Sequence, residues 1–267
     1  MKRWFFAFAA TALAAFCLGP FLLQLFTSLK PDSELTHWDW TSATFDNYRS
    51  LVGRPDFLRA VLNSFAVAAA STALCLTLGA SAAFALGRLR FPGSQWLLSA
   101  ALAVSMFPTV STVSPLYLIV RALGLRDQLA GLVLPYTTFA LPLTLWTLSA
   151  FFRDMPDDLY RAARVDGCSV IQAFWKVFLP LAAPGLVTTG LLVFISAWNE
   201  FLYALTFISS PERRTLPVAV SLFSTDQAEP WGEIMAASVL ATLPLLVVTV
   251  AFQWRIVAGL TAGAVKG

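Results

Sequence analysis

Six long runs of apolar residues constrain the fold of this chain more than any other feature. A helix that crosses the hydrocarbon core of a bilayer needs about 20 consecutive, mainly apolar residues. The segments that meet this requirement are 4–26, 60–86, 96–120, 132–152, 181–207 and 234–254. The sequence therefore predicts an all-α polytopic membrane protein, with six transmembrane helices in a single domain that covers residues 1–267.

The composition supports a membrane protein and excludes several other classes. Of the 267 residues, 58% are hydrophobic and 12% are charged, whereas an ordinary soluble domain has about 45–50% apolar and about 25% charged residues. A soluble chain of this composition would expose large apolar patches and aggregate. We therefore expect no soluble enzyme and no nucleic-acid partner. A single histidine, His37, and three widely separated cysteines indicate neither a metal site nor a disulfide framework.

The first apolar run resembles a signal peptide at its start, because Lys2 and Arg3 precede it. The run continues to Phe26, however, and is longer than the apolar region of about 7–15 residues in a signal peptide. We therefore interpret it as an uncleaved first span.

The charges of the loops predict the orientation. If the N-terminus is cytoplasmic, the inner segments carry ten basic and four acidic residues, and the outer segments carry eight basic and ten acidic residues. This difference agrees with the positive-inside rule. Six spans return the C-terminus to the starting side, so we predict that both termini are cytoplasmic. The two long loops are then 27–59 outside and 153–180 inside.

The inner loop 153–180 reads as two short helices joined by a glycine turn. Pro156 suits a first helical turn, and Asp157 and Asp158 follow it near the positive end of the helix dipole. Asp166-Gly167 then ends this helix. Ser169 and Gln172 form the capping-box pattern that starts a second helix over 170–178, before Pro180.

The first of these helices has a stripe of mostly small side chains, formed by Leu159, Ala162, Ala163 and Asp166. Small side chains beside a sharp turn allow the backbone of another protein to approach closely. The loop is thus either a docking element or a solvated connector with an amphipathic stretch on the membrane surface.

The sequence Arg161-Ala-Ala-Arg-Val-Asp-Gly167, followed by Leu179-Pro180, resembles the EAA loop of ABC importer permeases. In that family the loop forms coupling helices that sit in a groove of each ATP-binding subunit and transmit its closure. The resemblance assigns this coupling role to Leu159, Arg161, Ala162, Ala163, Asp166 and Gly167. Two residues depart from the motif, since Arg161 replaces its glutamate and Cys168 replaces the small residue after its glycine.

Further segments are similar to the carbohydrate-uptake branch of this family, and within it to the second permease subunit of maltose- and trehalose-type importers. They are Trp198-Asn-Glu-Phe201, Leu216-Pro-Val218 and the C-terminal Gly259–Gly267. The resemblance implies a type I importer permease in a bacterial cytoplasmic membrane. It also implies a second, homologous permease, two cytoplasmic subunits that bind ATP and Mg²⁺, an external solute-binding protein and a sugar substrate.

Span five contains Glu200, which is the only acidic residue within a predicted span. In a continuous helix, Ser196, Asn199, Glu200 and Tyr203 fall on one polar stripe, next to Trp198. Amides and carboxylates match sugar hydroxyls, so these five residues are candidates to line a substrate path. The alternative is that Asn199 and Glu200 bind a neighbouring helix or cap a break in span five. Span three, which contains Pro108 and Pro115, is a second candidate wall.

The sequence also leaves other functions to consider. It contains no G-x-x-x-x-G-K-[ST] phosphate loop, so we expect that the chain is not itself the ATPase and has no cofactor of its own. The alternatives are a stand-alone secondary carrier or channel, a glycerol phosphate permease, and an intramembrane enzyme. The sequence alone does not select the sugar.

Overall fold

The computed structural model describes residues 2–32, 42–89, 91–223 and 230–262, and all of its regular elements within these ranges are helical. The longer α-helices are α1 (Lys2–Ser28), α3 (Pro55–Phe84), α4 (Ser94–Ser105), α5 (Thr109–Ala122), α6 (Ala130–Asp154), α10 (Ala183–Trp198) and α13 (Trp231–Ala262). The shorter ones are α2 (Asp46–Val52), α7 (Asp157–Val165), α8 (Val170–Ala173), α9 (Leu179–Leu181), α11 (Leu202–Phe207) and α12 (Leu216–Ser221). Two π-helical turns, η2 (Ala85–Leu89) and η3 (Phe174–Phe178), and one 3-10 turn, η4 (Pro211–Arg213), complete the series.

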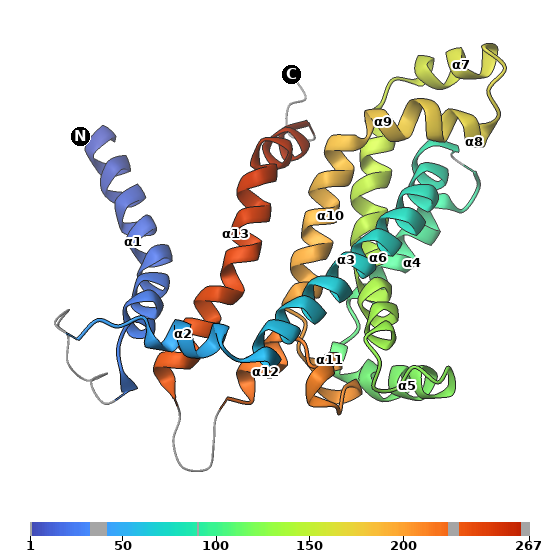
Figure 1. The fold of residues 1–267 in the computed structure, drawn as a ribbon. Helices are drawn as coiled ribbons and strands as arrows, with labels where there is room; N and C mark the ends of the chain where they lie inside the picture. The colour runs from blue at the N-terminus through green and yellow to red at the C-terminus, as the bar shows by residue number, and fades with distance from the viewer. Residues whose placement is uncertain (1, 33–41, 90, 224–229, 263–267) are drawn as a thin grey trace.

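The long helices run between two ends of the molecule (Figure 1). We refer to the end that carries α7 and α8 as the α7 end, and to the end that carries α2, α5, α11 and α12 as the α5 end. The start of α1 and the end of α13 both lie toward the α7 end (Figure 1). Helix α3 packs along α6 and α10, whereas α1 contacts α13.

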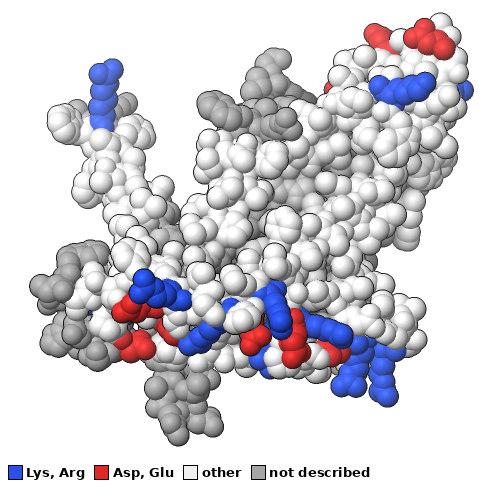
Figure 2. Space-filling view, in the orientation of Figure 1, with Lys and Arg blue, Asp and Glu red and all other residues white. Residues whose placement is uncertain are grey.

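The prediction of a polytopic helical membrane protein is confirmed. Four of the described helices are long and apolar enough to cross a membrane, and the number rises to six if two bent helix pairs each form one span. On the face shown in Figure 2, the charged side chains gather at the two ends and leave an uncharged zone between them. The most apolar window of α1 is 0% buried against the rest of the chain, as expected of a helix that faces lipid or another subunit.

The segment predicted as the third span, 96–120, is not one continuous helix. The segment is two helices, α4 and α5, which meet at an angle of 98°. The bend lies at Met106–Pro108, because proline cannot donate the helical hydrogen bond and forces the residue before it out of the helical region. As a result, α5 lies across the α5 end of the molecule (Figure 1).

The buried side chains form two clusters, one toward each end. The cluster toward the α5 end includes Trp198, Tyr203 and Phe207 together with residues of α3, α6, α12 and α13. The cluster toward the α7 end is built on Phe84, Phe152 and other aromatic residues. Each end of the bundle therefore has its own core.

Asp127 connects two loops at the α5 end. It adopts a positive φ of 57°, which aspartate tolerates better than most residues. Its carboxylate accepts hydrogen bonds from the backbone N–H groups of Ser209 (2.8 Å) and Ser210 (2.9 Å), and from the Ser210 hydroxyl. Arg213 donates to the Asp127 carbonyl and lies 3.7 Å from its carboxylate. The hydrogen bonds from Ser210 and Ser209, with a smaller contribution from Arg213, lower the pKa of Asp127 to about 2.

The Asp127 contacts predict a pH-dependent contribution to stability. Because the folded-state pKa lies below the ordinary value of 3.8, the contribution is complete above about pH 4 and is lost as the pH falls toward 2. Thermal unfolding of the purified protein and of Asp127→Asn should therefore differ at pH 6, and the difference should shrink at pH 3 and below. A difference in melting temperature that stays constant over this range would contradict the prediction.

Candidate functional site

The predicted helix–glycine turn–helix is present at the α7 end. Helix α7 begins directly after Pro156, and Gly167 adopts a φ of 81°, a conformation that suits glycine because it has no Cβ. Ser169 accepts from the N–H of Gln172 (3.2 Å), and the Gln172 side chain accepts from the N–H of Ser169 (2.8 Å). This capping box starts α8 as predicted. The helical path then continues through η3 and α9 to Leu181, beyond the predicted end at Phe178.

The exposure of the predicted coupling residues divides them into two groups. Arg161, Ala162, Asp166 and Gly167 are exposed, whereas Leu159 is partly buried and Ala163 is 5% exposed. The predicted stripe of small side chains is therefore not a single exposed surface. Leu159 packs against the aromatic cluster, since an amphipathic helix on a globular core turns its apolar side inward. The candidate docking surface is thus the outer face of α7 and its glycine turn.

This surface carries charged side chains of both signs, and most of its side chains are exposed. Arg161 lies 3.7 Å from Asp158, and both side chains are largely exposed. Arg164 donates a hydrogen bond to the Cys168 carbonyl at 2.7 Å, which fixes the start of the connection to α8. Val165, at the end of α7, is 86% exposed although it is apolar. A charged surface with an exposed apolar residue is suited to contact another protein.

The prediction of one continuous polar stripe in span five is wrong. Helix α10 ends at Trp198, and α11 begins only at Leu202. The carboxylate of Glu200 accepts from the backbone N–H groups of Tyr203 (2.9 Å) and Ala204 (3.2 Å). Glu200 therefore caps the first turn of α11, which is the alternative role considered for it above.

The five residues proposed for the substrate path have different surroundings. Trp198 is 2% exposed and donates from its indole nitrogen to the Ala241 carbonyl at 3.2 Å. Tyr203 is also 2% exposed, and its hydroxyl lies 2.6 Å from the Thr112 hydroxyl. Ser196 and Asn199 are exposed, and Glu200 is partly exposed. Thr112, in the segment predicted as span three, helps to hold Tyr203 and was not among the predicted site residues.

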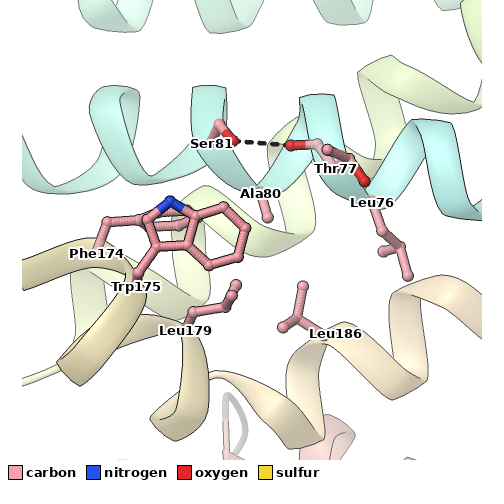
Figure 3. Close-up of a pocket in the computed structure, with 8 residues that line it drawn as sticks. All are labelled: Leu76, Thr77, Ala80, Ser81, Phe174, Trp175, Leu179 and Leu186. Carbon is pink, nitrogen blue, oxygen red and sulfur yellow. Dashed lines mark hydrogen bonds between the residues drawn. The ribbon is translucent and has the colours of Figure 1, made fainter. Parts of the chain in front are cut away.

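An apolar groove lies between α3 on one side and η3, α9 and the start of α10 on the other (Figure 3). It has a volume of about 220 Å³ and is lined by Leu76, Thr77, Ala80, Ser81, Phe174, Trp175, Leu179 and Leu186. The two hydroxyls of the lining are already used, because Thr77 donates to the Ala73 carbonyl and Ser81 donates to the Thr77 carbonyl. This lining suits hydrocarbon and does not suit a sugar.

Sequence reasoning missed Arg88, which it treated only as one of the inner charges. The structure places its side chain in the interior, against the connection between α6 and α7. The available signal was an arginine directly after Gly87, at the end of an apolar run.

The long apolar helices and the exposed element at the α7 end define a multi-pass helical membrane protein. The chain belongs to the family described as the binding-protein-dependent transport system inner membrane component, whose model matches residues 58–261. Transport in this family depends on a binding protein, so the family match does not favour the alternative of a stand-alone carrier. The family membership confirms the resemblance to ABC importer permeases.

The chain is similar to several characterised relatives over nearly its full length. It is 47% identical to the trehalose transport system permease protein SugB of Mycobacterium tuberculosis, with 98% of this chain and 97% of the relative covered. It is 38% identical to the trehalose/maltose transport system permease protein MalG of Thermococcus litoralis, with 100% and 98% covered. Its fold is similar to that of a chain in the crystal structure of a bacterial ABC transporter that imports alginate. The TM-score is 0.79 at 22% identity, with 94% and 96% of the two chains covered.

The capping role of Glu200 predicts a stability effect. In Glu200→Ala, two backbone N–H groups lose their acceptor, so the free energy of unfolding should fall by about 1 kcal/mol. Thermal or denaturant unfolding of the purified subunit would measure this change. Glu212→Ala removes an exposed carboxylate from the same end of the molecule and serves as the control, with little expected effect. Equal stability of the two variants would rule out the capping role.

Proposed function

We propose that this chain is a permease subunit of an ATP-driven importer that moves a sugar across the membrane by alternating access. The observation that carries the proposal is the exposed helix–glycine turn–helix at the α7 end, in a chain that belongs to a binding-protein-dependent transport family. An exposed and charged element beyond the ends of the spans is accessible to a soluble subunit, whereas the spans are not.

The partners follow from this role. Two cytoplasmic subunits would bind ATP and Mg²⁺ and would contact α7 through Arg161, Ala162, Asp166 and Gly167, with Leu159 and Ala163 supporting the surface from below. A second, homologous permease would complete the path. The lack of burial of α1 within the chain supports such a neighbour. An external solute-binding protein would deliver the sugar at the α5 end.

The proposed substrate is a disaccharide such as trehalose or maltose, because these are the sugars in the names of the two relatives. Ser196, Asn199 and Glu200 remain candidates to contact it, since their side chains are at least partly exposed. Trp198 and Tyr203 would then act indirectly, by holding α10 and α11 in place. The proposed location is a bacterial cytoplasmic membrane with both termini in the cytoplasm, on the side of α7 (Figure 1).

A transport assay tests the substrate. The full complex of both permeases, the ATP-binding subunits and the binding protein would be reconstituted in liposomes with ATP on the side of α7. We expect uptake of labelled trehalose or maltose that requires both ATP and the binding protein. Uptake without ATP, or uptake of glycerol phosphate with neither disaccharide, would contradict the proposal.

The glycine turn offers a test of the docking surface. Proline cannot adopt a positive φ, so Gly167→Pro should reorient α7 and reduce the amount of ATP-binding subunit that co-purifies with the permease. Gly124→Pro is the matched control, because Gly124 also has a positive φ, of 70°, and lies in the turn between α5 and α6. Its effect on co-purification should be small. Equal co-purification of the two variants would argue against docking at this turn.

A further inference from the structure

A buried arginine lies where the end of α3 meets the base of α7. Arg88 donates to the carbonyl of Met155 at 3.1 Å and to the carbonyl of Pro156 at 3.0 Å. Its guanidinium also lies 2.8 Å from the carboxylate of Asp157. These three partners are consecutive residues and form the whole connection from α6 into the first turn of α7.

The surroundings of Arg88 restrict the orientation of its side chain. Its side chain is only 3% exposed, and a guanidinium remains charged at any accessible pH, so it needs fixed partners to offset its lost hydration. The planar fork of N–H groups sets both the distance and the angle to its acceptors. The guanidinium also lies 5.3 Å from the ring centre of Phe178 and 5.9 Å from that of Tyr160.

The end of α3 is equally restricted on its other sides. A Cβ atom at Gly87 would lie 2.5 Å from the backbone oxygen of Ser149, so α3 and α6 are in close backbone contact here. The ring of Phe84 packs against those of Phe152, Phe174 and Phe178, with centroid distances of 5.7, 5.2 and 5.1 Å. The end of α3 is therefore packed closely against both α6 and η3.

Helix α3 extends from this junction to the α5 end, where it contacts other segments. Asn63 donates to the carbonyls of Glu212 and Arg214, at 3.0 Å each. The hydroxyl of Ser64 accepts from the N–H of Leu216 at 2.7 Å. A displacement of α3 at the α7 end would thus reach the loop between α11 and α12, at the opposite end of the molecule (Figure 1).

We propose that Arg88 is a positioning residue for transport, which transmits movements of α7 to α3. The chain joins α7 directly to α6 and, through the glycine turn, to α8, but it does not join α7 to α3. The buried hydrogen bonds and the ion pair of Arg88 connect the base of α7 to the end of α3. This inference rests on the proposed function, because it assumes that a soluble subunit moves α7.

The test uses the reconstituted complex and two measurements. The first is the stimulation of ATP hydrolysis by the trehalose-loaded binding protein, which requires a signal from the α5 end to the α7 end. The second is the number of trehalose molecules taken up per ATP hydrolysed. In Arg88→Met, which keeps the apolar stem and removes the guanidinium, both values should fall by about tenfold. Basal ATP hydrolysis and co-purification of the ATP-binding subunits should persist.

Two further variants separate positioning from a purely structural role. Arg88→Lys keeps the charge near Asp157 but cannot donate to both carbonyls in the same geometry, so both values should recover in part. Arg59→Met is the matched control, since Arg59 lies on the same helical segment as Arg88, Pro55–Leu89, in a largely exposed pair with Asp56 at 3.8 Å. It should leave both values unchanged.

The outcomes separate the failure of this inference from that of the proposed function. If Arg88→Met retains the wild-type stimulation and uptake per ATP, Arg88 does not transmit movement. If basal and stimulated hydrolysis fall in proportion, or if neither Arg88 variant assembles, Arg88 serves folding alone and the inference is equally overturned. If the wild-type complex itself shows neither stimulated hydrolysis nor uptake of trehalose or maltose, the proposed function fails, whereas a result confined to the Arg88 variants decides only this inference.

Discussion

The hydrocarbon core of a membrane contains no water that could bind the polar groups of a backbone, and the rest of this structure follows from that constraint. Each N–H and C=O group within the membrane must find its partner in the protein, so the segments that cross it are helical. At two of the interruptions between helices, one near the end of a span and one beyond it, a side chain takes over hydrogen bonds of the backbone. At the break between α10 and α11, the carboxylate of Glu200 binds two N–H groups. At the break between α6 and α7, the guanidinium of Arg88 binds two carbonyls.

The same constraint explains why the two ends of the molecule differ. Charged side chains are excluded from the central zone and gather at the ends (Figure 2). At the α5 end, they stabilise loops, as Asp127 does with Ser209 and Ser210. At the α7 end, Arg88 is buried, whereas the charged residues on the outer face of α7 are exposed, where a soluble partner can reach them. Helix α3 extends between the two ends: Asn63 and Ser64 bind segments at the α5 end, and Arg88, in the η2 turn that continues α3, binds the base of α7.

Local patterns in the sequence were sufficient for part of the candidate site. The turn at Gly167 and the capping box of Ser169 and Gln172 depend on residues within a few positions of each other, and the structure contains both. The apolar runs likewise predicted the helices, since their length relates directly to the thickness of a bilayer. A resemblance in the EAA-like segment and in spans five and six identified the family.

The bends and the inward contacts could not be predicted in the same way. The periodicity of span five assumed a continuous helix, whereas Glu200 ends one helix and caps the next. A proline such as Pro108 shows where a helix can bend, but the angle of 98° depends on the helices that pack around it. Ala162 and Ala163 are adjacent and chemically identical, and only the position of α7 on its core exposes one and buries the other.

The sequence by itself therefore determined the class of the protein, the number of apolar segments and the local form of the helix–glycine turn–helix, because each of these follows from composition or from contacts between near neighbours in the chain. Only the tertiary structure decided which side chains face outward and which hold distant segments together. Arg88 illustrates the difference, since its partner Asp157 is far away in the sequence. Its role depends on the close packing of α3 on α6, which no local pattern encodes.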